Sequence, residues 1–118
     1  MPRNISFMLT TQQYINQTKT VTRRLGWDFV KDGDIQNGCE KCQGLKKGEK
    51  INKLGQHRVV SHRWEPLKRM IDEPEYGKAE VIEEGFPDWT PQQFVAFFCE
   101  HNKCEPDVLV NRIEFEYV

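Results

Sequence analysis

The chain has 118 residues, of which 37% are hydrophobic and 11% aromatic, and its formal net charge is −1. This length and apolar content predict one domain with its own core, which excludes a disordered chain. No stretch approaches the roughly 18 consecutive apolar residues of a membrane span. The segment Met1-Pro2-Arg3-Asn4 also lacks the apolar run of a signal peptide, so we expect a cytoplasmic protein with no membrane partner.

Charge is distributed unevenly along the chain. Residues 1–70 carry 14 Lys and Arg against 6 Asp and Glu, a net charge of +8, whereas residues 71–118 carry 3 against 12, a net charge of −9. A basic half of this kind can attract phosphate or nucleic acid. The alternative is that the two halves neutralise each other across the folded surface, and the sequence leaves both open.

Apolar patterning predicts short strands along most of the chain and two helices. The first helix is expected at residues 10–17, with Thr10 as its N-cap, and a turn is expected at residues 31–34. From Gly38 to Lys53 the chain is rich in Lys and Gly, which indicates an exposed loop. Strand-like composition marks residues 5–9, 20–22, 58–64, 78–82 and 110–118.

The strongest local signal is Thr90-Pro91-Gln92-Gln93. A threonine N-cap, a proline at the first helical position and a glutamine at the third form a capping box. A helix is therefore expected to run to about His101. Its packed face is predicted to hold Phe94, Val95, Phe97 and Phe98.

The closing segment alternates apolar and polar residues from 110 to 118, and Arg112 is among the polar positions predicted to face water. Several short strands with two helices predict an α+β fold. A small β-barrel or a strongly bent sheet satisfies this pattern.

The segment Lys19-Thr20-Val21-Thr22-Arg23-Arg24 places an amine, two hydroxyls and two guanidinium groups within six residues. Such a cluster suits an anion or a polar base. In a strand, Thr22 and Arg24 would face one way and Lys19 and Arg23 the other, whereas a helical turn would place Lys19, Thr22 and Arg23 together. The alternative interpretation is a solvated charge run with ordinary strand threonines.

An acidic pair, in Glu83-Glu84-Gly85-Phe86, comes shortly before the C-terminal helix. A Lys, a Thr and a Glu brought together by folding can activate a hydroxyl nucleophile.

Four cysteines form two pairs, Cys39-x2-Cys42 and Cys99-x4-Cys104. The first pair has zinc-ligand spacing and the second is looser, so a shared tetrahedral zinc site is a weaker alternative to four reduced thiols. We expect no metal and no other cofactor.

The histidines and tryptophans give weaker signals. His57, His62 and His101 lack paired ligand spacing and are expected at the surface or at a sheet edge. A core position is expected for Trp27, Trp64 and Trp89, with stacking on a bound base as the alternative.

The order of these elements resembles the ASCH domain. It runs from the first strand and helix through the K-T-x-T-x-R string at residues 19–24 and Glu84-Gly85-Phe86 to the helix opened by Thr90-Pro91 and the closing strand. That domain is a branch of the PUA-like β-barrel superfamily. The resemblance covers almost the whole chain. It implies a single α+β domain over residues 1–118, a small PUA-like (ASCH) β-barrel with two or more short flanking helices. Relative to the smallest members, this chain has a loop insertion at about 38–53.

Domains of this family resemble readers of RNA or modified bases, and small bacterial members resemble amidohydrolases of N4-acetylcytidine and related N4-acylated cytidines. The resemblance implies a modified nucleoside or RNA as the partner. Lys19, Thr22 and Glu84 match the positions that line the cleft and are the expected catalytic residues. Arg24 matches the arginine that ends the string, and Arg23 and Arg24 are the expected substrate-binding residues.

In the implied reaction, Thr22 attacks the acyl carbon and Lys19 takes its proton, which requires a depressed Lys19 pKa. Glu84 donates or relays a proton to the leaving N4, and Arg24 supports the oxyanion or the base carbonyl.

Two other functions stay open. A non-catalytic RNA or modified-base reader would use Glu84 only to hydrogen-bond the cytosine amino group, and a basic face could instead bind a host protein. The acyl preference, the choice between nucleoside and RNA, the oligomeric state and the role of the loop are not fixed by the sequence.

Overall fold

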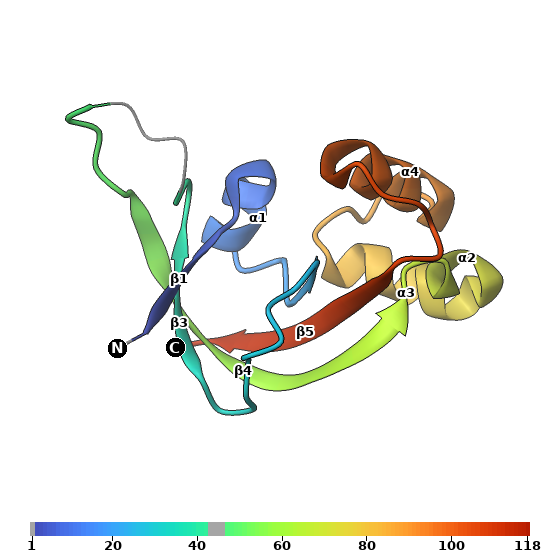
Figure 1. Ribbon diagram of the computed structural model, residues 1–118, viewed down its shortest axis with the longest axis horizontal. Helices are drawn as coiled ribbons and strands as arrows, with labels where there is room; N and C mark the ends of the chain where they lie inside the picture. Colours follow the sequence, from blue (N-terminus) through green and yellow to red (C-terminus); the bar gives the residue numbers. More distant parts are fainter. Residues whose placement is uncertain (1, 43–46) are drawn as a thin grey trace.

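The computed structural model describes residues 2–42 and 47–118. Five strands form one curled sheet in the order β1-β3-β4-β5-β2 (Figure 1). The pair of β1 and β3 is parallel, and the other neighbours are antiparallel. The strands are β1 (Arg3–Ser6), β2 (Val21–Arg24), β3 (Ile35–Cys39), β4 (Lys53–Pro66) and β5 (Leu109–Tyr117).

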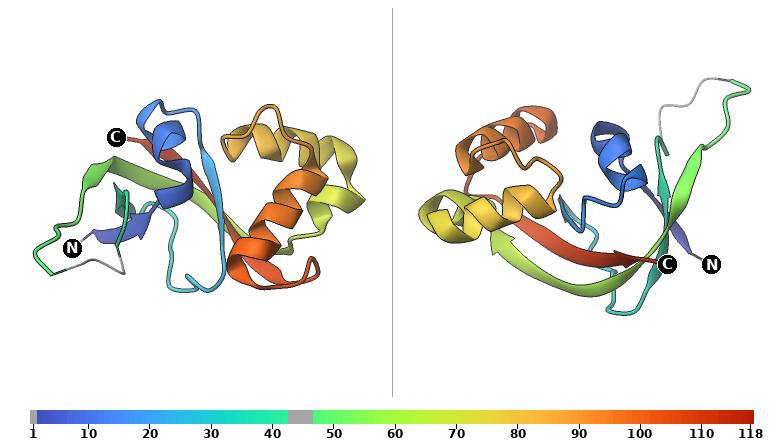
Figure 2. Two further views of the ribbon diagram at one scale, coloured as in Figure 1. Left: turned by 90° about the horizontal axis from the view of Figure 1, so that it is seen from above. Right: turned by 180° about the vertical axis from the view of Figure 1, so that it is seen from behind.

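Short helices flank both ends of this sheet. A 3-10 turn (η1) and α1 lie over one end, while α2, α3 and α4 gather at the other (Figures 1 and 2). This is a half-barrel α+β fold of PUA-like type, so the predicted fold class is confirmed. The helical segments are η1 (Met8–Thr10), α1 (Thr11–Ile15), α2 (Arg69–Asp72), α3 (Pro74–Glu83) and α4 (Pro91–Asn102).

Two separate core regions hold the two ends. Under α2, α3 and α4, buried apolar side chains from all three helices pack against Leu67 and Val110. At the other end, Tyr14 of α1 packs with Phe7 and Phe115. A pocket lies between η1 and α4.

Several predicted elements are confirmed with small shifts. The capping box at Thr90 forms as expected, with Thr90 Oγ1 accepting from the Gln93 backbone N–H at 3.1 Å and the Gln93 side chain accepting from the Thr90 backbone N–H at 2.8 Å. Thr10 is the N-cap of α1, although its side chain makes no capping hydrogen bond. The first strand spans Arg3–Ser6 rather than residues 5–9, and η1 begins at Met8.

The strand predicted at residues 78–82 is wrong, because these residues belong to α3. Pro74 opens this helix at its first turn, and helical spacing turns Gly77, Glu80 and Val81 inward. Gly77 packs against the backbone of α2, where an added Cβ would lie 1.9 Å from the Met70 carbonyl oxygen. The β-branched residues suggested a strand, and tertiary packing overrode them.

The loop predicted from Gly38 to Lys53 is shorter at both ends, because Gly38 and Cys39 close β3 and Lys53 opens β4. Residues 40–42 and 47–52 carry no helix or strand, and residues 43–46 lie outside the described part of the chain. Gly38 belongs to β3 because it pairs with Ile5 of β1 and Gly55 of β4, and the Tyr14 ring covers it. A Cβ there would lie 2.2 Å from Tyr14 Cζ.

His57 is buried, which corrects its predicted surface position. Its ring lies 2.8 Å from the Tyr14 hydroxyl and 2.8 Å from Gln36 Oε1. Burial, with the charge of Arg24 acting in the same direction, lowers the pKa of His57 to about 4. No helix within the described ranges is long and apolar enough to cross a membrane.

Candidate active site

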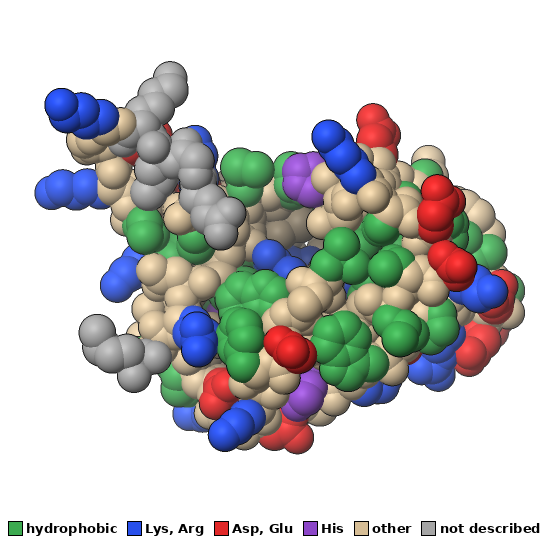
Figure 3. Space-filling model, viewed as in Figure 1, with side chains coloured by type: hydrophobic (Ala, Val, Ile, Leu, Met, Phe, Trp, Pro, Cys, Tyr) green, Lys and Arg blue, Asp and Glu red, His purple; other side chains and the backbone are tan. Residues whose placement is uncertain are grey.

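A pocket of about 330 Å³ opens beside β2, between η1 and α4. Figure 3 shows this hollow, with Lys or Arg side chains in its floor and hydrophobic side chains around it. The polar lining consists mainly of Lys19, Thr22, Arg23, Arg24 and Glu84. The apolar lining consists of Phe7, Met8, Leu9, Leu25, Trp27, Phe86, Phe94, Phe97 and Phe98. The structure therefore brings all five predicted site residues into one pocket.

Strand geometry decides how β2 presents its side chains. Thr22 and Arg24 share one side of the strand, and Arg24 Nε donates to Thr22 Oγ1 at 3.0 Å. Arg23 faces the other way and lies directly opposite Arg112 of β5. Of the two alternatives for this segment, the strand is therefore confirmed and the helical turn is not formed at Val21–Arg24.

Lys19 and Glu84 form a buried ion pair at the end of α3. The Lys19 ammonium lies 2.7 Å from Glu84 Oε1 and 2.9 Å from the Glu84 carbonyl oxygen. Two local features bring these segments together. The Thr20 backbone N–H donates to the Glu83 carbonyl at 2.8 Å, and Gly85 turns the chain with a φ of 101°.

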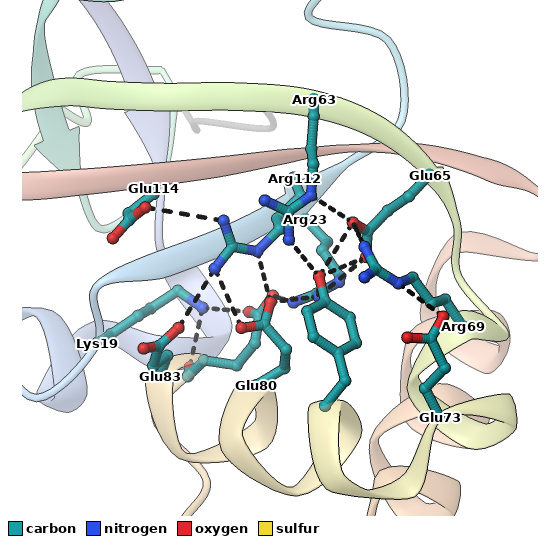
Figure 4. Close-up of polar contacts among 12 residues, drawn as sticks. Lys19, Arg23, Arg63, Glu65, Arg69, Glu73, Glu80, Glu83, Arg112 and Glu114 are labelled. Atoms are coloured by element: carbon teal, nitrogen blue, oxygen red, sulfur yellow. Dashed lines mark hydrogen bonds and ion pairs between the residues drawn. The ribbon is translucent and has the colours of Figure 1, made fainter.

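Arg23 contacts three carboxylates with its terminal nitrogens (Figure 4). Nη1 lies 2.9 Å from Glu84 Oε2, while Nη2 lies 2.5 Å from Glu80 Oε1 and 3.3 Å from Glu65 Oε2. Its side chain is 0% exposed. The position of Arg23 at the floor of the pocket thus fixes the Glu84 carboxylate from the side opposite Lys19.

Glu80 joins Arg23 to Arg112, the guanidinium across the sheet. Arg112 donates to both Glu80 oxygens, from Nε at 2.5 Å and from Nη2 at 3.0 Å. Arg112 is buried, contrary to its predicted place on a wet strand face. Two arginines side by side in a cross-strand pair repel unless a carboxylate lies between them, and Glu80 of α3 supplies it.

The site chemistry depends on the charge state of Lys19. Burial lowers the pKa of Lys19 below its ordinary value, Glu84 opposes this shift, and the cations Arg24 and Arg23 reinforce it. A lysine held this way reaches its neutral, basic form at a lower pH than an exposed lysine does.

We predict that the Glu80 carboxylate makes the free energy of unfolding depend on pH. Burial acts to raise its pKa, but hydrogen bonds and charges from Arg112 and Arg23 prevail and hold that pKa at about 2. A carboxyl group whose pKa is depressed in the folded state stabilises the fold fully at pH values above its unfolded pKa near 4. This contribution, about 3 kcal/mol in all, is lost as the pH falls towards 2. Urea unfolding at several pH values between 7 and 3 should show a flatter pH dependence in Glu80→Gln than in the parent. Equal slopes would contradict this assignment.

Sequence reasoning missed Glu65, Glu80 and Arg112. Glu80 was hidden by the strand prediction for its segment, and Arg112 by the alternating pattern of β5. Glu65 accepts from Arg63 Nε at 2.8 Å and from the Tyr76 hydroxyl at 2.8 Å, contacts that no local motif encodes.

The cysteines and most of the tryptophans lie outside the pocket. All four cysteines are free, and residues 2–42 and 47–118 contain no group of three or more His, Cys, Asp or Glu placed to hold a metal ion. Of the tryptophans, Trp27 lines the pocket, Trp89 stacks on Phe86 at 4.1 Å between ring centroids, and Trp64 is exposed rather than in the core.

The curled sheet with short flanking helices is consistent with a small PUA-like barrel. No family model matches the sequence, and no curated protein matches it. Solved structures that share the fold include the following two. Protein EF3133 from Enterococcus faecalis V583, described by the family model DUF984, has a TM-score of 0.60 and 18% identity over 100% of this chain and 80% of its own. Hypothetical protein PH0355 has a TM-score of 0.63 and 15% identity over 99% and 97%. At these identities the likeness concerns the fold alone.

Proposed function

We propose that this protein is an amidohydrolase that removes the acyl group from N4-acylated cytidine. One observation carries the proposal. An amine, a hydroxyl and a carboxylate from Lys19, Thr22 and Glu84 line one pocket with aromatic walls, although Glu84 is distant in sequence. Because the structural neighbours support the fold only, the chemistry rests on these side chains.

The pocket offers complementary surfaces for a base. Phe97 and Trp27 are half-buried in its wall and provide flat apolar faces for a cytosine ring. The Glu84 carboxylate has lone pairs beyond those used by Lys19 and Arg23, so it can also accept from the N4–H of the substrate.

In the proposed reaction, Thr22 Oγ attacks the acyl carbon and its proton passes to the neutral Lys19 amine. The tetrahedral intermediate collapses, the carbon–N4 bond breaks, and N4 receives a proton from Lys19, with Glu84 fixing the amine in place. Cytidine leaves and the acyl group remains as an ester on Thr22. Water then hydrolyses this ester, which releases the carboxylic acid and restores the hydroxyl.

Arg24 prepares the hydroxyl for this attack. Its Nε–H donates to Thr22 Oγ1, which fixes the oxygen and leaves the hydroxyl proton free to point towards a base. A cation at this position also favours the developing alkoxide.

The proposal predicts a specific dependence of rate on pH. Lys19 acts as a base only when neutral, and burial lowers its pKa, so kcat/KM should rise about tenfold per pH unit and level off below the ordinary lysine range near 10. Initial rates of cytidine release between pH 6 and pH 10 provide the measurement. A flat profile across this range would exclude Lys19 as the base.

Incubation of the purified protein with N4-acetylcytidine and N4-benzoylcytidine, with cytidine followed by chromatography, tests the proposed function. Release of cytidine from either compound in proportion to enzyme supports it. Absence of release from both, at enzyme concentrations near that of the substrate, would overturn it.

One feature favours a second candidate, a non-catalytic reader of a modified base. Lys19 is ion-paired with Glu84, and the hydrogen bond of Thr22 is made with Arg24 rather than with Lys19. A reader needs only such fixed donors and acceptors. Binding of N4-acetylcytidine, detected by tryptophan fluorescence, without any cytidine release would favour this candidate.

A further inference from the structure

In the part of the chain that the structure describes, Arg24 differs from the other cations of the pocket in having no carboxylate partner. Three buried cations, Lys19, Arg23 and Arg112, contact three buried carboxylates, Glu65, Glu80 and Glu84. Within the described residues, Arg24 is the one cation lining the pocket that makes no ion pair. Arg24 therefore presents to the pocket a guanidinium that has no carboxylate at ion-pair distance among the described residues.

Arg24 is held in position by uncharged partners. Nε donates to Thr22 Oγ1 at 3.0 Å, Nη2 donates to the Ser6 carbonyl at 2.6 Å, and the guanidinium carbon lies 5.1 Å from the centre of the Phe7 ring. A guanidinium has five N–H groups, so these two bonds leave others for a ligand. Burial lowers the pKa of Arg24 to about 10, which still leaves it protonated at neutral pH.

The bond from Arg24 to Thr22 determines which part of a substrate lies beside the free charge. Both groups belong to one hydrogen-bonded pair, so a group that contacts the rest of the guanidinium lies next to the carbon that Thr22 attacks. In an N4-acylcytidine that neighbouring region is the acyl chain. The ribose and any 5′-phosphate lie at the opposite end of the nucleoside.

We propose that the acyl group of the substrate carries a carboxylate, and that Arg24 binds it. The substrate class is then the half-amide of a short dicarboxylic acid on N4 of cytidine, of which the succinyl derivative is the simplest probe. This inference rests on the proposed function. The bond broken is the same carbon–N4 bond, and the products are cytidine and the free dicarboxylic acid.

The test compares N4-succinylcytidine with its N4-succinamoyl analogue, which has the same size and shape but carries a neutral amide in place of the carboxylate. A charge-assisted bond to arginine should raise kcat/KM for the succinyl compound at least about 10-fold over the analogue. In Arg24→Gln the ratio of kcat/KM for the succinyl compound to kcat/KM for the analogue should fall to about 1. Arg24→Lys keeps the charge and should retain part of the preference.

Arg58→Gln is the matched control. Arg58 pairs with Glu116 on the surface, and its removal should leave the preference unchanged. The preference should also decrease with added salt. A parent protein that cleaves both compounds equally well would overturn the inference while leaving the hydrolase proposal intact.

Binding to Thr22→Val, measured by calorimetry, separates the two proposals. One outcome is that the parent cleaves neither compound, while the succinyl compound binds more tightly than the succinamoyl analogue to the parent and to Thr22→Val. The hydrolase proposal then fails and the carboxylate subsite stands. N4-acetylcytidine 5′-monophosphate provides a final arm. Tighter binding of this nucleotide than of its nucleoside, with no tighter binding of the succinyl compound than of its analogue, would assign Arg24 to a phosphate. That result would overturn the inference of an acyl carboxylate.

Discussion

Replacement of Thr22 by valine is expected to reduce cytidine release from N4-acetylcytidine by at least about 10³-fold. Valine matches threonine in size and branching and suits an extended strand, so β2 should keep its place in the sheet. The substitution removes the oxygen that attacks the acyl carbon and the acceptor of the Arg24 Nε–H. Single-turnover rates with enzyme in excess give the measurement.

Thr20→Val is the matched control for this variant. Thr20 lies two residues earlier in the same segment and is not among the residues that line the pocket. Its substitution should change the rate less than about 3-fold, within the range of ordinary surface effects. If Thr22→Val retained a rate close to that of Thr20→Val, the nucleophile would have to be a water molecule rather than this hydroxyl.

Arg23→Gln is expected to destabilise the fold by about 3–5 kcal/mol, because it leaves buried carboxylates without their cation. The Arg23 side chain is fully enclosed and contacts Glu65, Glu80 and Glu84, so water cannot replace it without opening the pocket floor. Urea unfolding at pH 7 measures the loss. The same variant should also lower activity, since Glu84 loses one of its two cationic partners.

The exposed pair of Arg58 and Glu116 provides the comparison, with a similar separation of 3.0 Å between its charged atoms. Its loss in Arg58→Gln should cost less than about 1 kcal/mol, because water screens both groups. Equal destabilisation by the two variants would mean that the buried network contributes no more than a surface ion pair.

The features that the sequence predicted correctly are encoded locally. The capping box at Thr90 needs only neighbouring side chains, and the closing strand β5 follows from local strand composition, although its burial does not alternate because residues 110–113 are all buried. The cluster at residues 19–24 and the Glu83-Glu84 pair were singled out by residue type, and the family resemblance assigned their roles. The meeting of the five candidate residues in one pocket depends on the turn at Gly85, which carries φ near 101°.

The features that the sequence did not predict depend on contacts between distant segments. Val81 and Ile82 favour a strand by propensity, yet both lie in α3, where Val81 packs in the core and Glu80 contacts Arg23 and Arg112. His57 was expected at the surface, and it is buried because Tyr14 and Gln36 supply polar partners. Such pairings become visible only when strand register is known.

The most direct test of the account is a single-turnover reaction of the parent protein with N4-acetylcytidine, quenched in acid and digested with trypsin. We predict stoichiometric cytidine together with an acetyl group on Thr22, found in the peptide Thr20-Val21-Thr22-Arg23. Recovery of intact N4-acetylcytidine from a protein that demonstrably binds it would contradict the hydrolase and assign this pocket to a reader.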